Sequence, residues 1–458
     1  MTDDRVDDHL DVETLRCFGD HELEREALFE VAWHLFLCGR CRALLPEAGP
    51  RAEALFGKMF GESRFQHDES SYTGVTRHVA EKFRRLGIQI ERERTSAADL
   101  WRELEPHPPS RRRLLVENAS RFATYGFAEY LLGECRRTWC EGPGTAEELA
   151  ELALAVVYRL DRRIHGTALL NDLKAEAWSY IANCRRIRSD LRSVTEAFDL
   201  AEEFRVQGSG DLLEEAELLS LKASYYRDQR QFDEALQAVD RAIEIFREAG
   251  DRQGQGRGLV QRATTLRQAG DVEVAIDTLE HAATLVDASQ EPRMQLLLHG
   301  NLVLYLSESG RGPEAKKLLP EVRHLATAVG GALDRIRASW LEGLVAMCCG
   351  HDTTAEAALR DAMEGFADQG IGYDAALVAL DLAAFYLETN RTGQARELAL
   401  EMIPIFTTRD VHREALAALS IVQRAMEEGA ATVAMVQEAA RYFRRARRNP
   451  ALRFEFVQ

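Results

Sequence analysis

An alanine recurs at intervals of forty residues through the second half of this 458-residue chain, at Ala235, Ala275, Ala315, Ala355 and Ala395. A fixed period of this length is typical of repeat proteins, in which each unit buries its apolar face only against its neighbours. Such units stack into an elongated solenoid with a long surface instead of closing around one pocket. The period therefore predicts a solenoid that serves as a binding scaffold.

Each unit is expected to be a pair of antiparallel helices. A mostly small side chain stands twelve residues before each of these alanines and another stands seven residues after it. Small side chains let two helices approach closely, and added methylenes at such a contact cost roughly 1–3 kcal/mol. Turn-forming residues separate the two expected helices at 228–231, 270–271, 310–313, 350–353 and 390–393. The small residues are Ala223, Ala263, Val303, Gly343 and Ala383 before the alanine, and Ala242, Ala282, Val322, Ala362 and Met402 after it.

The composition favours an all-α protein. Apolar residues make up 46% of the chain, and its eleven prolines lie mostly between the expected helices. No run of alternating β-branched residues is long enough to predict a sheet. We therefore expect an all-α solenoid.

The repeats resemble the tetratricopeptide repeat, whose signature is W-x2-L-G-x2-Y followed by A-x3-F. The earliest copy carries Trp178, Ile181 and Ala182 in its first helix, and the resemblance covers residues 168–407 as six units. The unit is longer than the usual thirty-four residues, so longer helices are expected. The resemblance implies a right-handed superhelix whose first helices line a concave groove that holds a peptide or a partner helix.

The predicted groove changes character along its length. In the first three units, polar residues stand one residue and four residues after the small residue of the first helix, whereas the later units are apolar. Arginine binds a carboxylate through two parallel hydrogen bonds, so we expect a protein or peptide ligand that is acidic where it meets the arginines. The alternative is that the arginines pair with acidic residues of neighbouring helices. The candidate groove residues are Asn183, Arg186, Ser224, Arg227, Thr264, Arg267, Trp340, Leu344 and Met347.

A candidate metal site lies near the beginning of the chain, in the motif His34-x3-Cys38-x2-Cys41. Residues four and seven apart share a face of a helix, so these three side chains can converge. Tetrahedral zinc needs a fourth ligand, and His9 precedes His34 by twenty-five residues. A helical hairpin without metal is the alternative, and Cys17 or His21 could replace His9 as a ligand.

This segment resembles the zinc-binding anti-sigma domain. The family has a histidine or cysteine, a D-G-E-L-like turn and then H-L-x2-C-x2-C, and here the turn is Gly-Asp-His-Glu-Leu at residues 19–23. The resemblance implies a structural Zn²⁺ bound by His9, His34, Cys38 and Cys41. It also implies an alternative function, a bacterial transcription regulator whose zinc domain binds a sigma factor.

The chain shows no pattern typical of an enzyme, a nucleic-acid-binding protein or a membrane protein. No H-E-x-x-H, phosphate loop or G-x-S-x-G motif is present, and the glycines at 254, 256 and 258 follow no strand. The net charge of −17 opposes binding to nucleic acid or anionic lipid. No stretch of eighteen apolar residues and no signal sequence occurs, and eight cysteines in so long a chain favour a reducing compartment. We expect a non-enzymatic cytoplasmic protein.

These observations predict five segments. The first is a helical zinc-binding domain, and the second is a connector with a polar loop at 61–74 and helices at 75–86 and 96–104. Degenerate helical repeats follow, then the six regular units, then a helical cap that contains the basic run 441–448. The expected segments are residues 1–50, 51–110, 111–167, 168–407 and 408–458.

Overall fold

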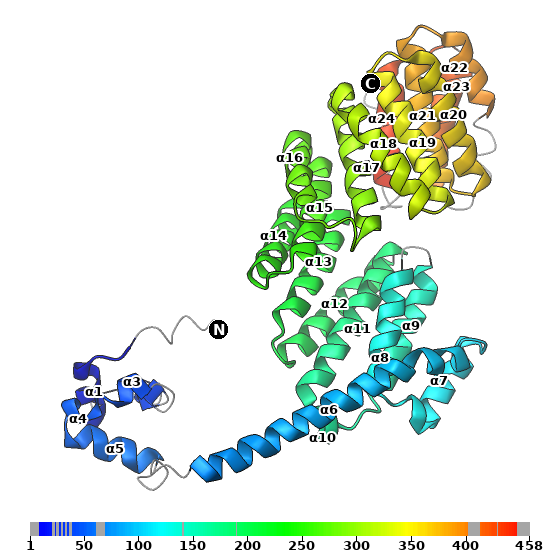
Figure 1. Ribbon diagram of the computed structural model, residues 1–458. Coiled ribbons are helices and arrows are strands. Elements are labelled where there is room, and N and C mark those ends of the chain that lie inside the picture. Colours follow the sequence, from blue (N-terminus) through cyan, green and yellow to red (C-terminus); the bar gives the residue numbers. More distant parts are fainter. Residues whose placement is uncertain are drawn as a thin grey trace. The chain divides into compact units, whose positions relative to one another are not determined.

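The computed structural model describes residues 9–20, 23, 27–28, 31–32, 34–35, 39–60, 69–139, 142–188, 190–401, 413–427 and 429–446. Every regular element in these ranges is a helix (Figure 1). The chain divides into two compact units, Met1–Ile88 and Gln89–Gln458, and the division falls within helix α6 (Glu69–Leu104). None of the described helices is long and apolar enough to cross a membrane.

The first unit contains short helices around a small core. Its helix α1 begins where the side chain of Asp11 accepts a hydrogen bond from the backbone N–H of Thr14, at 2.7 Å. Helices α1 and α5 pack closely, because a Cβ atom on Gly19 would lie 2.5 Å from the backbone nitrogen of Ala52. The helices described in this unit before α6 are α1 (Val12–Gly19), α3 (Gly39–Arg42), α4 (Leu45–Ala48) and α5 (Pro50–Phe60).

The predicted connector differs from the structure in one respect. We expected a loop through residue 74 and separate helices at 75–86 and 96–104, but α6 is one continuous helix from Glu69. The intervening residues are rich in glutamate and arginine, which favour helix even without a buried face. In the second unit, the end of α6 packs on the helix that begins at Tyr125, whose backbone N–H donates a 2.8 Å hydrogen bond to Glu93.

The repeat region consists of helix pairs, and most second helices pack closely against the first helix of the next pair. Two helices, α8 (Tyr125–Thr138) and α9 (Pro143–Val157), precede the six regular pairs, with α7 (Pro109–Asn118) before them and the short α10 (Arg162–His165) after them. The regular pairs are α11 (Thr167–Ile187) with α12 (Leu191–Val206), α13 (Leu212–Asp228) with α14 (Phe232–Glu248), α15 (Arg252–Ala269) with α16 (Val272–Ala283), α17 (Pro292–Glu308) with α18 (Gly312–Ala328), α19 (Ala332–Cys348) with α20 (Asp352–Asp368), and α21 (Gly372–Glu388) with α22 (Thr392–Glu401).

The forty-residue period also appears in the backbone. The turn within each of the last five pairs contains one residue with a positive φ angle: 63° at Arg230, 112° at Gly270, 74° at Gly310, 68° at Gly350 and 57° at Asn390. Glycine and asparagine adopt this left-handed conformation more readily than other residues. Arg230 is the exception, and it is the turn residue with the largest steric cost.

The small residues of the period lie where helices touch. The alanine that marks each of these five units is almost completely buried, with at most 2% of its surface exposed. At Gly343 a Cβ atom would lie 2.7 Å from Cγ of Leu359, so α19 and α20 approach too closely for a larger residue. The sequence-based interpretation of small residues as helix contacts is therefore confirmed here, while Met402 lies outside the described residues.

Two helices are described after the sixth pair, α23 (Arg413–Glu427) and α24 (Val433–Ala446). Helix α23 contacts α22, as expected of a cap that follows the last pair. Helix α24 instead packs mainly against α21, the first helix of the sixth pair. The last of the described helices therefore covers a helix that the repeat pattern would leave open on one side.

Candidate functional site

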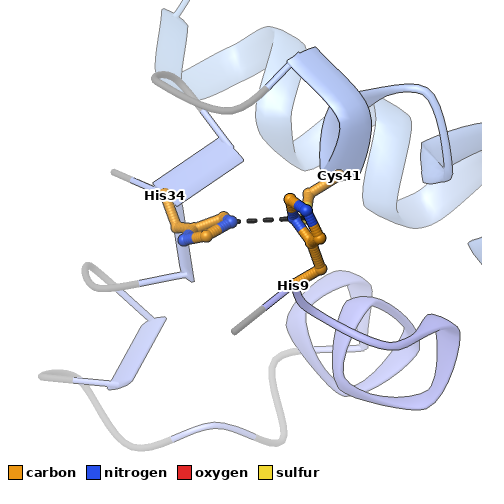
Figure 2. A group of neighbouring side chains, drawn as sticks. All are labelled: His9, His34 and Cys41. Carbon is orange, nitrogen blue, oxygen red and sulfur yellow. Dashed lines mark hydrogen bonds between the residues drawn. The ribbon is translucent and has the colours of Figure 1, made fainter. Parts of the chain in front are cut away.

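Three of the four predicted zinc ligands lie together in the first unit (Figure 2). The Sγ atom of Cys41 lies 3.2 Å from Nε2 of His34 and 3.4 Å from Nδ1 of His9. All three potential ligand atoms lie within 4.8 Å of one another. The fourth predicted ligand, Cys38, lies outside the described residues.

The geometry of this cluster fits a metal centre. Ligand atoms of a tetrahedral zinc ion lie about 3.5 Å apart, because Zn–S and Zn–N bonds are about 2.3 and 2.0–2.1 Å long. The side chain of Cys41 is buried, and the backbone N–H of Leu10 points at its sulfur from 3.3 Å. A hydrogen bond donated to sulfur favours the thiolate, which is the form that binds metal. His9, His34 and Cys41 can therefore hold a metal ion.

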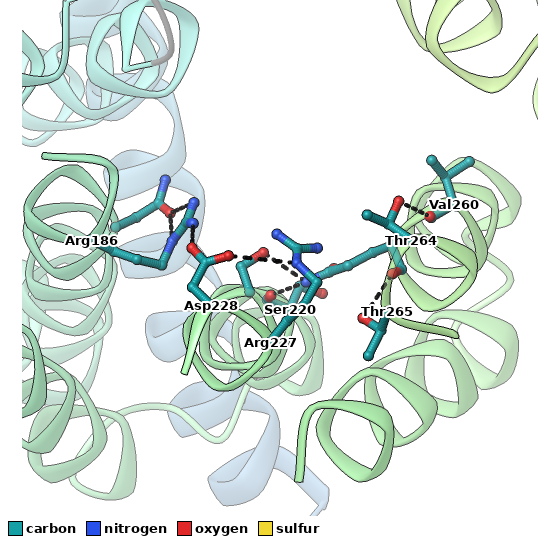
Figure 3. Close-up of polar contacts among 10 residues, drawn as sticks. Arg186, Ser220, Arg227, Asp228, Val260, Thr264 and Thr265 are labelled. Carbon is teal, nitrogen blue, oxygen red and sulfur yellow. Dashed lines mark hydrogen bonds and ion pairs between the residues drawn. The ribbon is translucent and has the colours of Figure 1, made fainter. Parts of the chain in front are cut away.

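Two of the three predicted arginines, Arg186 and Arg267, link consecutive first helices. Figure 3 shows Arg186 beside Asp228 and Arg227. Arg186 of α11 forms an ion pair with Asp228 of α13, and the two side chains are only 14% and 6% exposed. The amide oxygen of Asn183 accepts two further hydrogen bonds from Arg186, at 2.9 and 3.1 Å. The guanidinium is therefore held in place by its own chain.

The other two arginines also have acidic neighbours. Nε of Arg227 lies 3.7 Å from a carboxylate oxygen of Asp228. Nε of Arg267 on α15 lies 3.5 Å from the carboxylate of Glu308 on α17, and its guanidinium lies over the ring of Tyr305, 5.0 Å from its centre. Arg186 and Arg267 thus pair with acidic residues of neighbouring helices, whereas the acidic neighbour of Arg227 lies on its own helix.

The polar residues between the arginines also form hydrogen bonds, either to a neighbouring helix or within their own helix. The side-chain amide of Gln261 on α15 donates a 2.9 Å hydrogen bond to the hydroxyl of Ser224 on α13. The hydroxyl of Thr264 donates to the backbone oxygen of Val260 within α15, at 2.9 Å. Gln261 was not predicted. Gln261 also contacts the backbone oxygen of Ser220, 41 residues earlier in the chain. This separation is close to the forty-residue repeat period, which places first helices side by side.

The predicted apolar part of the groove carries a buried polar contact. Nε1 of Trp340 on α19 donates a 2.9 Å hydrogen bond to the carboxylate of Asp381 on α21. Arg444 of α24 approaches the other oxygen of the same carboxylate at 3.4 Å. Leu344 and Met347 lie on the same helix as Trp340, and both are half-buried. Sequence reasoning missed Asp381, and it placed Arg444 only in the basic run 441–448 of the terminal helix.

A cavity of about 180 Å³ lies between α8, α11 and α13. Its acidic and basic lining residues are Glu176, Glu214 and Glu217 together with Arg136 and Arg205. Burial, together with the carboxylates of Asp172 and Glu176, raises the pKa of Glu214 to about 8. Arg136 reaches the carboxylate of Glu217 at 3.0 Å. The lining also contains the apolar side chains of Leu213, Leu218 and Leu221. The cavity thus combines an apolar surface with three carboxyl groups and two arginines.

Comparisons with known proteins agree with this architecture. Residues 214–288 match the tetratricopeptide repeat. No curated protein is a significant match to the chain.

Two solved structures share the fold at low sequence identity. A Rap protein complexed with competence and sporulation factor has a TM-score of 0.52 and 13% identity, over 71% of this chain and 92% of that protein. The apo form of RapI has a TM-score of 0.51 and 11% identity, over 69% of this chain and 86% of that protein. The chain is therefore a helical solenoid that carries tetratricopeptide repeats.

Proposed function

We propose that this chain is a non-enzymatic scaffold that binds a protein or peptide on the surface formed by the first helices of its repeats, which we call the first-helix surface. The observation that carries the proposal is the cavity between α8, α11 and α13, which combines apolar and charged lining. Pockets of this mixed kind fix both the position and the orientation of a ligand. The fold similarity to a Rap protein complexed with competence and sporulation factor supports the proposal.

The six polar groove residues, Asn183 to Arg267 of the predicted set, belong to the proposed contact surface. A guanidinium has five N–H donors, so it can keep one carboxylate partner while it binds a second. An acidic group of the partner would share Arg186 with Asp228 and Arg267 with Glu308. The proposed partner therefore carries carboxylates that bind Arg186 and Arg267 while these arginines keep their own acidic partners. The acidic character of the partner is a prediction.

The test compares two exposed apolar residues on different surfaces. Leu213 lines the cavity and is 40% exposed, whereas Val274 on the second helix α16 is 48% exposed. The full chain is used to capture partners from native lysate, and the captured proteins are identified and titrated. We expect Leu213→Lys to weaken binding at least tenfold and Val274→Lys to leave it unchanged. Equal binding by both variants would exclude the first-helix surface near the cavity.

We also propose a structural Zn²⁺ at His9, His34, Cys38 and Cys41. The cluster of three potential ligand atoms within 4.8 Å supports it. The metal content of the full chain, measured by elemental mass spectrometry, is expected to be one zinc per chain and to be lost in Cys41→Ser. Cys17→Ser is the control, and zinc retained in Cys41→Ser would contradict the proposed ligand set.

The sigma-factor partner and the cytoplasmic location stay predictions of the sequence. Co-purification of a sigma factor with the full chain, lost in Cys41→Ser and kept in Leu213→Lys, would favour the anti-sigma alternative. Co-purification of a partner that is kept in Cys41→Ser and lost in Leu213→Lys would favour the scaffold.

A further inference from the structure

Helix α24 packs on α21, the first helix of the sixth repeat, and shares the carboxylate of Asp381 with Trp340 of the fifth. The ring of Phe443 packs against Tyr373 of α21 with centres 5.9 Å apart. Its next residue, Arg444, reaches Asp381 at 3.4 Å. The face of α24 that becomes buried consists of Val436, Ala439, Ala440, Tyr442, Phe443 and Ala446.

The burial of α21 shows how fully it is covered. Every residue from 372 to 386 is buried except Asp381, although α21 belongs to the last regular pair. At the equivalent positions 212–226 of α13, an internal helix, the buried residues are only Ala216, Leu218, Leu221 and Ala223. An end helix would normally be the more exposed of the two. The additional cover on α21 therefore comes from α24, on a side that internal repeats leave partly open.

The contact between Arg444 and Asp381 also distinguishes α24 from a simple cap. The side chain of Asp381 is 13% exposed, and burial raises the pKa of its carboxyl while Arg444 acts in the opposite direction. A buried carboxylate without a cationic partner is costly. Arg441, one turn earlier on α24, pairs instead with Glu438 of its own helix and is 65% exposed. Arg444 thus contributes to the contact between α24 and α21, whereas Arg441 pairs within its own helix.

We propose that α24 is an internal ligand of the surface formed by α19 and α21, and that a partner binds there as a basic amphipathic helix that displaces it. The inference rests on the proposed function, because it names the class of partner for one part of the first-helix surface. Binding of an amphipathic helix in a groove is a common mode of protein recognition.

The features that α24 uses define the partner. Its helix must carry an aromatic residue to pack against Tyr373 and small residues where α24 has Ala439 and Ala440. It must also carry a cation next to the aromatic residue, because Asp381 and Trp340 form a fixed acidic position on this surface. An acidic peptide would leave that carboxylate unpaired. The partner for this part of the surface is therefore basic.

The experiment uses the full chain and a fluorescent peptide with the sequence of α24 as the probe. Phe443→Ala removes the ring that anchors α24, and Arg441→Gln is the control on the same helix. Because apparent affinity scales with the fraction of chains whose site is open, we expect Phe443→Ala to bind the peptide at least tenfold more tightly than the wild type. Arg441→Gln should bind it as the wild type does.

A second substitution tests the acidic position. Asp381→Asn keeps an oxygen for the indole N–H of Trp340 but removes the charge. Added to Phe443→Ala, it should weaken peptide binding at least tenfold. If Phe443→Ala lowers the stability of the whole solenoid, Arg444→Gln, which keeps the ring, should still increase peptide binding over the wild type.

The inference would be overturned if the wild type, Phe443→Ala and Arg444→Gln bound the peptide equally. It would also be overturned if adding Asp381→Asn to Phe443→Ala left peptide binding unchanged. The proposed function would survive that outcome, because it is tested by Leu213→Lys on another repeat.

Discussion

The guanidinium of Arg186 forms an ion pair with the carboxylate of Asp228 across two successive repeats, with both side chains largely buried. Arg267 and Glu308 repeat this relationship between the third and fourth regular pairs. These arginines hold the first helices together, in addition to their proposed contact with a partner. Their replacement will therefore affect stability as well as binding.

We expect Arg186→Gln to lower the free energy of unfolding by about 3 kcal/mol, because it leaves a buried carboxylate with a weaker partner in Arg227. Urea denaturation of the full chain measures the change. Arg241→Gln is the control, since Arg241 is 47% exposed and pairs with Glu244 on its own helix. Its expected cost is below about 1 kcal/mol. Equal costs for the two variants would exclude a structural role for the Arg186 ion pair.

Because the pKa of Glu214 is raised in the folded chain, we expect the free energy of unfolding to depend on pH. Its pKa is raised from 4.5 to about 8 by burial and by Asp172 and Glu176, so the folded chain binds more protons than the unfolded chain between these values. Stability contributed by this group is present below pH 4.5 and is lost as the pH rises through about 8. We expect Glu214→Gln to be more stable than the wild type above pH 8, on the order of 1 kcal/mol after allowance for solvent screening. The difference should vanish near pH 4.

The measurement for Glu214→Gln is the urea midpoint as a function of pH. Glu244→Gln on the exposed surface of α14 controls for the loss of one negative charge. A constant difference between Glu214→Gln and the wild type from pH 4 to pH 9 would contradict the raised pKa.

The close approach of α19 and α20 at Gly343 means that a larger residue there would overpack the contact. We expect Gly343→Ala to cost about 1–3 kcal/mol, because its Cβ atom would lie 2.7 Å from Cγ of Leu359. Gly300→Ala in α17 is the matched control, since the nearest atom would lie 3.7 Å away. Alanine favours helix over glycine, so the control should gain up to about 1 kcal/mol. Calorimetric melting of both variants gives the comparison, and a stabilised Gly343→Ala would disprove the close contact.

Metal removal should affect the first unit selectively. A structural zinc contributes on the order of 10–16 kcal/mol in small metallo-domains, and the first unit has a small core. We expect a chelator to abolish a separate transition of this unit in calorimetry and to leave the main transition of the solenoid unchanged. The same trace with and without chelator would argue against a structural metal.

The sequence by itself determined the helix pairs, their turns and the small residues at their contacts. Each of these depends on residues within one helix or between two successive helices, where a local period is sufficient, as at Gly343 or Gly310. The helical spacing of His34 and Cys41 marked these two residues as candidate ligands that can converge. His9 was added because tetrahedral zinc needs a fourth ligand and because the segment resembles the zinc-binding anti-sigma domain.

Only the tertiary structure decided which side chains meet across the repeats. The sequence contains many carboxylates and does not mark Asp228 and Glu308 among them. Only the stacking of the first helices brings these two next to Arg186 and Arg267. The placement of α24 on α21 is likewise absent from any local pattern, because it depends on a contact between Arg444 and Asp381, sixty-three residues apart. Periodicity fixes which face of a helix is buried, whereas the three-dimensional packing of distant segments decides what buries it.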